Sequence, residues 1–138
     1  MARTHIPRGM SLFHGTSAKE DFTVPDWSSF FSDSKTVAGK FVRHRREGGT
    51  PRILEFRVAR RILKLALIET AEEYDALIEK LGRKLGYDPL SFPHSQIVCE
   101  SGLEGWVIPH NYPEGADIML CSPGRWLEFV RAEPYEGP

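Results

Sequence analysis

The chain has 138 residues, of which 41% are hydrophobic. That is enough to bury one core and too little for two ordinary domains, so we expect a single domain over residues 1–138. The formal net charge of −1 at pH 7 gives the whole molecule no general attraction to nucleic acid or to an anionic membrane. No apolar run approaches the ~20 residues of a membrane-spanning helix, and the first ten residues lack the apolar segment of a secretory signal. We therefore expect a soluble, cytoplasmic protein with no membrane partner.

The charges are unevenly distributed along the chain. Between residues 40 and 61, eight basic residues stand against two acidic ones. Such a stretch can face a phosphate-bearing ligand or an acidic partner, and it can equally form the solvated face of a helix and a strand. Both interpretations stay open.

The two cysteines, Cys99 and Cys121, are far apart in the sequence. In a chain without a secretory signal, isolated thiols are more often reduced core residues than partners in a disulfide. We therefore interpret both as reduced.

The first 50 residues predict two strands and one helix. Apolar residues between two glycines predict a strand over residues 10–14, and residues 16–28 have no hydrophobic period and predict a loop. Residues 29–32 predict a second strand. Asp33 or Ser34 then supplies an N-cap for a helix that ends before a pair of glycines.

The rest of the chain predicts strands around one clear helix. Thr70 and Glu73 form a capping box for a helix over about residues 70–85, and we assign this helix to packing and not to a site. Residues 88–102 give no clear signal. Strands are expected at residues 53–58, 63–68, 106–108, 118–121 and 126–130. This order, with strands at both ends and helices between them, predicts an α+β fold.

Several site classes are excluded by the motifs that the sequence lacks. It has no dinucleotide-binding glycine fingerprint, no P-loop, no serine-hydrolase elbow and no paired CxxC motifs. His94, Cys99 and His110 are too irregularly spaced to suggest a metal site.

Two short motifs and one later aromatic residue remain. They are His14-Gly15-Thr16 at the end of the first predicted strand, Phe30-Phe31-Ser32 in the second, and Phe41 eleven residues after Phe30 on the following helix. In this order and spacing, they resemble the diphtheria-toxin and poly-ADP-ribose-polymerase branch of the ADP-ribosyltransferases, which is often summarised as H-Y-E.

The resemblance implies a small bacterial or phage-type member of that branch. Its fold would be split, mainly antiparallel β-sheets with a few flanking helices. NAD would be its substrate, and it would cleave the nicotinamide–ribose bond and transfer ADP-ribose to a protein or nucleic-acid acceptor. Residues 11–41 carry the specific part of the match, and residues 51–56, 105–108 and 117–123 extend it. The acceptor and the oligomeric state are not implied.

The resemblance also implies roles for the motif residues. Phe30 and Phe41 would clamp the nicotinamide, backbone groups of Gly15 would bind its carboxamide, His14 would bind the adenosine ribose, Thr16 would fix the loop, and Phe31 and Ser32 would complete the NAD-binding strand. Phenylalanine stands at both positions where the family usually has tyrosine, so ring stacking is kept and a phenolic hydrogen bond is lost.

The third motif of the family is a glutamate at the start of a late strand. Here Asp117 is the best match, and Glu114 lies three residues before it. Nicotinamide in NAD is already cationic and leaves without a general acid, so the carboxylate would stabilise the positively charged ribose and assist the nucleophile. Both carboxylates stay candidates for this role.

Three alternatives remain open. An RNA 2'-phosphotransferase on the same fold would need arginines aimed at an RNA phosphate, for which Arg43, Arg52 and Arg57 are candidates. An NAD glycohydrolase would differ only in using water as the nucleophile. The substitutions at the tyrosine and glutamate positions also suit a catalytically inactive module that binds NAD or ADP-ribose. Acceptor choice would depend on the loops at residues 18–28 and 89–102.

Overall fold

The computed structural model describes residues 1–17, 27–44 and 49–136, with the side chains of residues 43 and 44 outside the description. The strands of this part are β1 (Arg3–Ile6), β2 (Ser11–Thr16), β3 (Ser29–Phe31), β4 (Arg52–Val58), β5 (Ile62–Leu67), β6 (Gly105–Tyr112), β7 (Gly115–Leu120) and β8 (Leu127–Pro134). The helices are α1 (Lys35–His44), α2 (Ala71–Leu85), α3 (His94–Glu100) and a 3-10 turn, η1 (Pro123–Arg125).

The strands form two sheets. One has five strands in the order β1-β5-β6-β7-β3, and the other has three in the order β2-β4-β8. Every pairing is antiparallel except that of β5 with β6. The predicted α+β fold with split, mainly antiparallel sheets and a few helices is confirmed.

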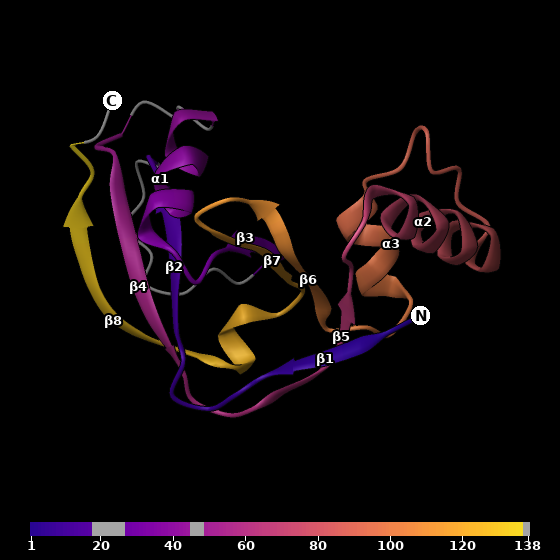
Figure 1. Ribbon diagram of the computed structural model, residues 1–138, viewed down its shortest axis with the longest axis horizontal. Coiled ribbons are helices and arrows are strands. Elements are labelled where there is room, and N and C mark those ends of the chain that lie inside the picture. Colours follow the sequence, from indigo (N-terminus) through magenta and orange to yellow (C-terminus); the bar gives the residue numbers. More distant parts are fainter. Residues whose placement is uncertain (18–26, 45–48, 137–138) are drawn as a thin grey trace.

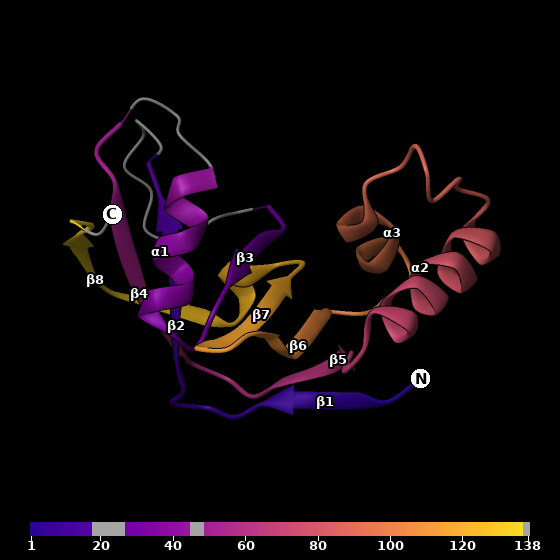
Figure 2. The same ribbon diagram turned by 45° about the horizontal axis from the view of Figure 1, so that its top comes forward.

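The helices occupy opposite ends of the molecule (Figure 1). The three-stranded sheet and α1 lie at one end, α2 and α3 lie at the other, and β3, β6 and β7 lie between them. The turned view keeps α1 beside β2 and separates it from α2 and α3 (Figure 2). The five-stranded sheet therefore presents one face to the smaller sheet and the other to α2 and α3.

Each face of the five-stranded sheet covers a core of its own. The inter-sheet core includes Leu12, Phe31, Leu54, Phe56, Ile118 and Leu120. The helix-side core includes Ile78, Leu81, Ile97, Val98, Trp106 and Met119. Successive side chains of a strand point to opposite faces, so β3 sends Phe31 into the first core and Phe30 toward the second. By the same rule, Asp117 of β7 faces the helix side, between Ala116 and Ile118 of the inter-sheet core.

Helix α1 packs closely on β2 because β2 carries a glycine at the contact. A Cβ at Gly15 would lie 1.9 Å from the carbonyl oxygen of Ala38 and 2.7 Å from Cγ2 of Val42. The motif glycine therefore has a packing role in the fold, independent of any ligand.

The N-cap predicted for α2 at Thr70 is confirmed, while the Glu73 carboxylate accepts from the backbone N–H of Glu69 and not from that of Thr70. The Thr70 hydroxyl accepts a hydrogen bond from the backbone N–H of Glu73 at 3.1 Å, and Gly86 ends the helix in the left-handed conformation at φ +78°. The helix carries acids in its first turn and bases in its last, which suits its dipole.

Strand β1, helix α3 and the short η1 turn were not predicted from the sequence. Strand β1 is an edge strand in which only Ile6 is buried, so it shows no hydrophobic alternation. Helix α3 falls in the segment without a clear signal, and its N-cap, Pro93, makes no side-chain capping bond. Among the described residues, no helix combines the length and apolarity needed to cross a membrane.

The interpretation of the cysteines as reduced is wrong for this structure. Cys99 and Cys121 form a disulfide that joins the C-terminal end of α3 to the residue after β7. Packing brings both residues to the edge of the helix-side core, and spacing in the sequence gave no sign of that proximity.

Reduction of the disulfide is expected to destabilise the fold. For a loop closed over a separation of 22 residues, the loss is about 3 kcal/mol in free energy of unfolding. Thermal unfolding with and without a reductant measures this loss. A Cys99→Ser/Cys121→Ser variant should melt like the reduced wild type and ignore the reductant. Equal melting temperatures for the oxidised and reduced wild type would contradict the stabilising role.

Gly15→Ala is expected to cost about 1–3 kcal/mol or more of stability, because the new methyl group meets backbone that cannot move independently. Gly39→Ala is the matched control on α1: its Cβ would meet the Tyr135 ring at 2.5 Å, and that side chain can rotate away. Denaturant unfolding of the two variants should show the larger loss at Gly15, and an equal or smaller loss there would contradict the close packing of α1 on β2.

Candidate functional site

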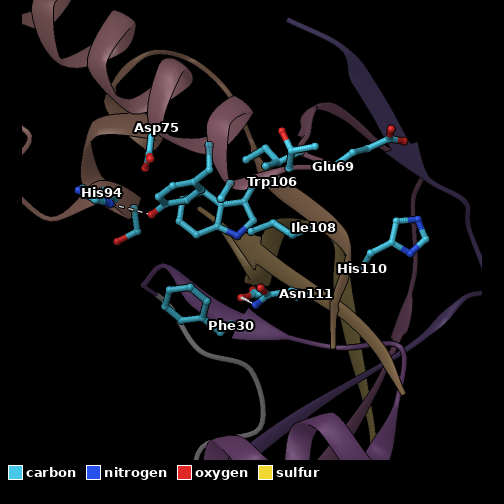
Figure 3. Close-up of a pocket in the computed structure, with 14 residues that line it drawn as sticks. Phe30, Glu69, Asp75, His94, Trp106, Ile108, His110 and Asn111 are labelled. Carbon is cyan, nitrogen blue, oxygen red and sulfur yellow. Dashed lines mark hydrogen bonds between the residues drawn. The ribbon is translucent and has the colours of Figure 1, made fainter. Parts of the chain in front are cut away.

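A pocket of about 640 Å³ opens on the helix side of the five-stranded sheet. This volume lies within the usual range for small-molecule sites. Strands β3, β6 and β7 line it together with the starts of α2 and α3; its residues are Phe30, Ile68, Glu69, Thr70, Ala71, Tyr74, Asp75, His94, Ser95, Trp106, Ile108, His110, Asn111 and Asp117. Figure 3 shows Phe30 and Asn111 on one side of the pocket and Asp75 and His94 on the other, with Trp106 between them.

Three aromatic rings form one wall. The ring centroids of Phe30 and Trp106 are 6.0 Å apart, and those of Tyr74 and Trp106 are 5.5 Å apart in an edge-to-face arrangement. Trp106 is 4% exposed, which fixes its indole. The wall offers flat apolar surfaces of the kind that bind planar or cationic groups.

The indole nitrogen of Trp106 is a donor that the described residues do not satisfy. The Nε1 atom is buried and has no hydrogen-bond partner in the part of the chain that the structure describes. Its nitrogen-bearing edge faces the side of the pocket on which Asn111 lies (Figure 3). Buried donors are normally paired, so the unpaired Nε1 atom is an unusual feature of this wall.

Tyr74 and His94 form a short polar chain. His94 Nε2 lies 3.0 Å from the carbonyl oxygen of Pro89, which can only accept, so Nε2 carries a proton. In the neutral imidazole, Nδ1 then accepts from the Tyr74 hydroxyl at 2.7 Å. Burial, followed by the charges of Asp117 and Asp75, raises the pKa of Tyr74, which keeps the phenol protonated. The oxygen of Tyr74 can therefore accept a further hydrogen bond.

The pocket is acidic. Glu69, Asp75 and Asp117 line it, and none of the described lining residues is lysine or arginine. Asn111 donates to Asp117 Oδ2 at 3.2 Å and orients the carboxylate. Asp117 also raises the pKa of Tyr112 at the end of β6, after the larger effect of burial.

His14 lies beside the pocket and does not line it. It is 6% exposed, its Nδ1 atom is 2.7 Å from the carbonyl oxygen of Phe30, and its ring packs on Phe31 at 5.3 Å. This bond connects the first motif with the second and holds the backbone on which the pocket residue Phe30 stands.

Gly15 and Thr16 continue β2 past the point where β3 meets it. Phe13 exchanges two backbone hydrogen bonds with Ser32, at 2.7 and 2.9 Å, and β2 pairs with β4 without a bulge. Because backbone groups alternate along a strand, the N–H and C=O of Gly15 point to the same edge as those of Phe13. Thr16 is 5% exposed, at the end of the strand.

The other residues of the second motif are structural. Phe31 is completely buried in the inter-sheet core. The Ser32 hydroxyl, also buried, accepts from the backbone N–H of Ser34 at 3.1 Å and so begins the turn into α1.

Phe41 contacts the end of β6 and does not belong to the pocket lining. The ring centroids of Phe41 and Tyr112 are 6.1 Å apart, and Nζ of Lys40 lies over the Tyr112 ring, 5.2 Å from its centroid. Glu114 stands in the turn between β6 and β7, where Lys40 binds it at 2.8 Å and lowers its pKa. Of the two candidate carboxylates, Asp117 lines the pocket and Glu114 does not.

The start of β7 is also attached to the start of α1. The Asp33 carboxylate accepts from the backbone N–H of Ala116 at 3.0 Å. A Cβ at Gly115 would lie 2.6 Å from Cβ of Ser34, so the contact needs glycine. The second and third sequence motifs therefore meet directly, next to Asp117.

Sequence reasoning missed most of the pocket. Helix α2 was assigned to packing alone, yet it contributes Tyr74 and Asp75, and α3 contributes His94. One signal was available for Tyr74: an aromatic residue stands alone among the acids of an otherwise polar helix turn. His94 and Trp106 gave no comparable signal.

The arginines that an RNA phosphate would require do not line the pocket. Arg52 donates to the carbonyl oxygen of Thr50 at 3.1 Å, and Arg57 is exposed on β4. The side chain of Arg43 lies outside the described residues, as do residues 18–26 of the first acceptor loop.

The fold has a counterpart among solved structures. No family model matches the sequence, and no curated protein matches it significantly. The chain is similar to a chain in the crystal structure of the M. tuberculosis MbcT-MbcA toxin-antitoxin complex, with a TM-score of 0.58 and 12% sequence identity, over 94% of this chain and 86% of that one. At this identity, the likeness concerns the fold alone.

Proposed function

We propose that the protein is an NAD-dependent mono-ADP-ribosyltransferase, which cleaves the nicotinamide–ribose bond and passes ADP-ribose to a macromolecular acceptor. One observation supports this most: two of the three motif segments line one pocket, and the first motif is hydrogen-bonded to the second. His14 is bonded to the carbonyl of Phe30, Phe30 and Asp117 both line the cavity, and Asp33 connects α1 to the strand of Asp117.

The chemistry needs one carboxylate and flat apolar walls. As the bond to nicotinamide breaks, its electron pair stays on the pyridine nitrogen and C1 of the ribose becomes positively charged. In this proposal, Asp117 stabilises that charge, and Asn111 keeps its oxygens oriented. Asp117 is half-buried, and a charge there interacts with a neighbouring charge more strongly than it would in open water.

The aromatic residues hold the leaving group. In this proposal, Phe30 supplies one face from the pocket wall. The second face was predicted at Phe41, which packs on Tyr112 outside the pocket lining and would have to turn toward the pocket to stack on the ring. Backbone groups of Gly15, which is buried near the end of β2, would bind the carboxamide. Thr16 would fix the strand end, and His14 would position Phe30 and bind the adenosine ribose.

We extend the proposal to a toxin-like role, because the chain shares its fold with a chain of a toxin–antitoxin complex. The shared fold does not by itself specify a substrate. Transfer to a 2'-phosphate of RNA is the less favoured alternative, since Arg52 and Arg57 are turned to other contacts or to solvent.

The first test is release of nicotinamide from NAD by the purified protein, with and without cell lysate. Asp117→Asn should reduce release on the order of 100-fold, as expected for the loss or misplacement of a catalytic group. Glu114→Gln is the matched control and should retain wild-type turnover, because Glu114 pairs with Lys40 outside the pocket.

The products of the reaction distinguish the proposed transferase from its alternatives. Nicotinamide release with free ADP-ribose as the sole product would make the protein a glycohydrolase. NAD binding without release would make it a binding module. Loss of activity in Glu114→Gln alone would contradict the role of Asp117.

Stacking by the Phe30 ring can be tested with one variant that removes the ring and one that only adds a hydroxyl group to it. Phe30→Ala should raise the KM for NAD about tenfold by removing one aromatic contact of the substrate. Phe30→Tyr keeps the ring and should retain near-normal KM. Steady-state kinetics of the two variants, with circular dichroism to check folding, would distinguish them, and an equal loss in both would contradict stacking as the function of Phe30.

A further inference from the structure

We propose that a cluster of arginines on the side of the molecule away from the helices binds the phosphate backbone of nucleic acid. The arginine cluster comprises Arg8, Arg60, Arg61 and Arg125, and two of these end the basic stretch at residues 40–61. None of the four lines the candidate pocket. This surface is therefore additional to the proposed NAD site, and its test does not depend on NAD cleavage.

Three connections between strands bring the arginines together, at residues 7–10, 59–61 and 121–126. The backbone N–H of Gly9 donates to the carbonyl oxygen of Val58 at 2.8 Å, and that of Val58 donates to Met10 at 2.9 Å. The N–H of Ala59 donates to the carbonyl oxygen of Trp126 at 2.7 Å. Figure 1 and Figure 2 both show the β1–β2 and β4–β5 connections side by side and away from α1, α2 and α3. Segments far apart in the chain thus contribute their charges to one surface.

Two of the arginines are held in place by Trp126. The guanidinium carbon of Arg60 lies 5.1 Å from the centroid of the Trp126 ring, and that of Arg125 lies 5.2 Å from it. Arg60 also donates to the backbone carbonyl oxygen of Arg125 at 2.7 Å. Both side chains still reach solvent. A guanidinium restricted in this way loses little conformational entropy on binding, and its planar set of donors matches a phosphate group.

The arginine cluster keeps most of its positive charge. Arg125 binds Glu104 at 3.6 Å. Arg8, Arg60 and Arg61 are exposed, and none of them forms an ion pair within the part of the chain that the structure describes. Like charges that are gathered on one surface repel each other, and a ligand with several negative charges relieves this repulsion. The surface therefore suits a polyanion.

The surroundings favour a phosphate backbone over an acidic protein. Interfaces between proteins usually have an apolar centre within a polar rim. No large hydrophobic side chain is exposed in the three connections, all of which the structure describes, and two guanidinium groups lie over the Trp126 ring. Binding to a nucleic-acid backbone needs no apolar centre, because charge neutralisation and counterion release drive it. Contacts to phosphates alone carry no sequence information, so we expect no sequence preference.

Fluorescence anisotropy with a labelled single-stranded DNA oligonucleotide tests the proposal on the full chain, without NAD. A flexible strand can reach all four arginines. We expect a Kd of about 10⁻⁶ to 10⁻⁴ M at physiological salt, and a slope of log Kd against log salt concentration of about 3 for four phosphate contacts. In Arg8→Gln/Arg61→Gln, the Kd should rise about tenfold and the slope should fall by about 1.4, because two contacts are lost.

A second variant and a matched control complete the test. Arg60→Gln/Arg125→Gln removes the other half of the arginine cluster and should weaken binding at least as much. Arg83→Gln removes an exposed positive charge from α2, where Arg83 pairs with Glu79, and should leave the Kd and the slope at their wild-type values.

Three results would overturn the proposal. They are an absence of oligonucleotide binding at low salt, an equal loss of binding in Arg83→Gln, and tighter binding to poly-glutamate or to phosphatidylserine vesicles than to the oligonucleotide. The proposed NAD cleavage would stand in each case, because nicotinamide release is measured separately.

Discussion

The site depends on the twofold alternation of β3 and β7. Phe31 and Ile118 are buried in the inter-sheet core, and this fixes which way the strands face. Their neighbours Phe30 and Asp117 must then point toward α2 and α3. A slip of one residue in β7 would bury the carboxylate of Asp117 and expose Ile118, and a slip in β3 would exchange Phe30 with Phe31. The same burial that stabilises the fold therefore also holds the pocket in register.

The lining of the pocket combines acidic and aromatic side chains. Three acids share the cavity with aromatic rings and two histidines. Such a lining suits a planar cation, because carboxylates attract its charge and aromatic faces stack on its plane. The pyridinium of NAD is a group of this kind.

Much of the fold could be predicted from sequence because its strands alternate clearly and its long helix carries a capping box. Strand β1 was not predicted because an edge strand with one buried residue has no hydrophobic period. Helix α3 was not predicted because it is short and lacks a side-chain cap. Of the pocket lining, the family resemblance had named only Phe30 and Asp117. Tyr74 and His94 come from helices whose approach to the sheet depends on packing between distant segments. The disulfide depends on the same packing.

The covalent bond between α3 and the end of β7 has a further consequence. A cut in the backbone within the turn between β6 and β7 would divide the chain into two pieces, and the smaller would carry Asp117. Cys121 lies in that piece and Cys99 in the other, so the bridge would keep them together. A cleaved molecule would thus keep β7 covalently attached under oxidising conditions and lose this attachment when the disulfide is reduced. The redox environment would then determine how long the cleaved protein stays intact.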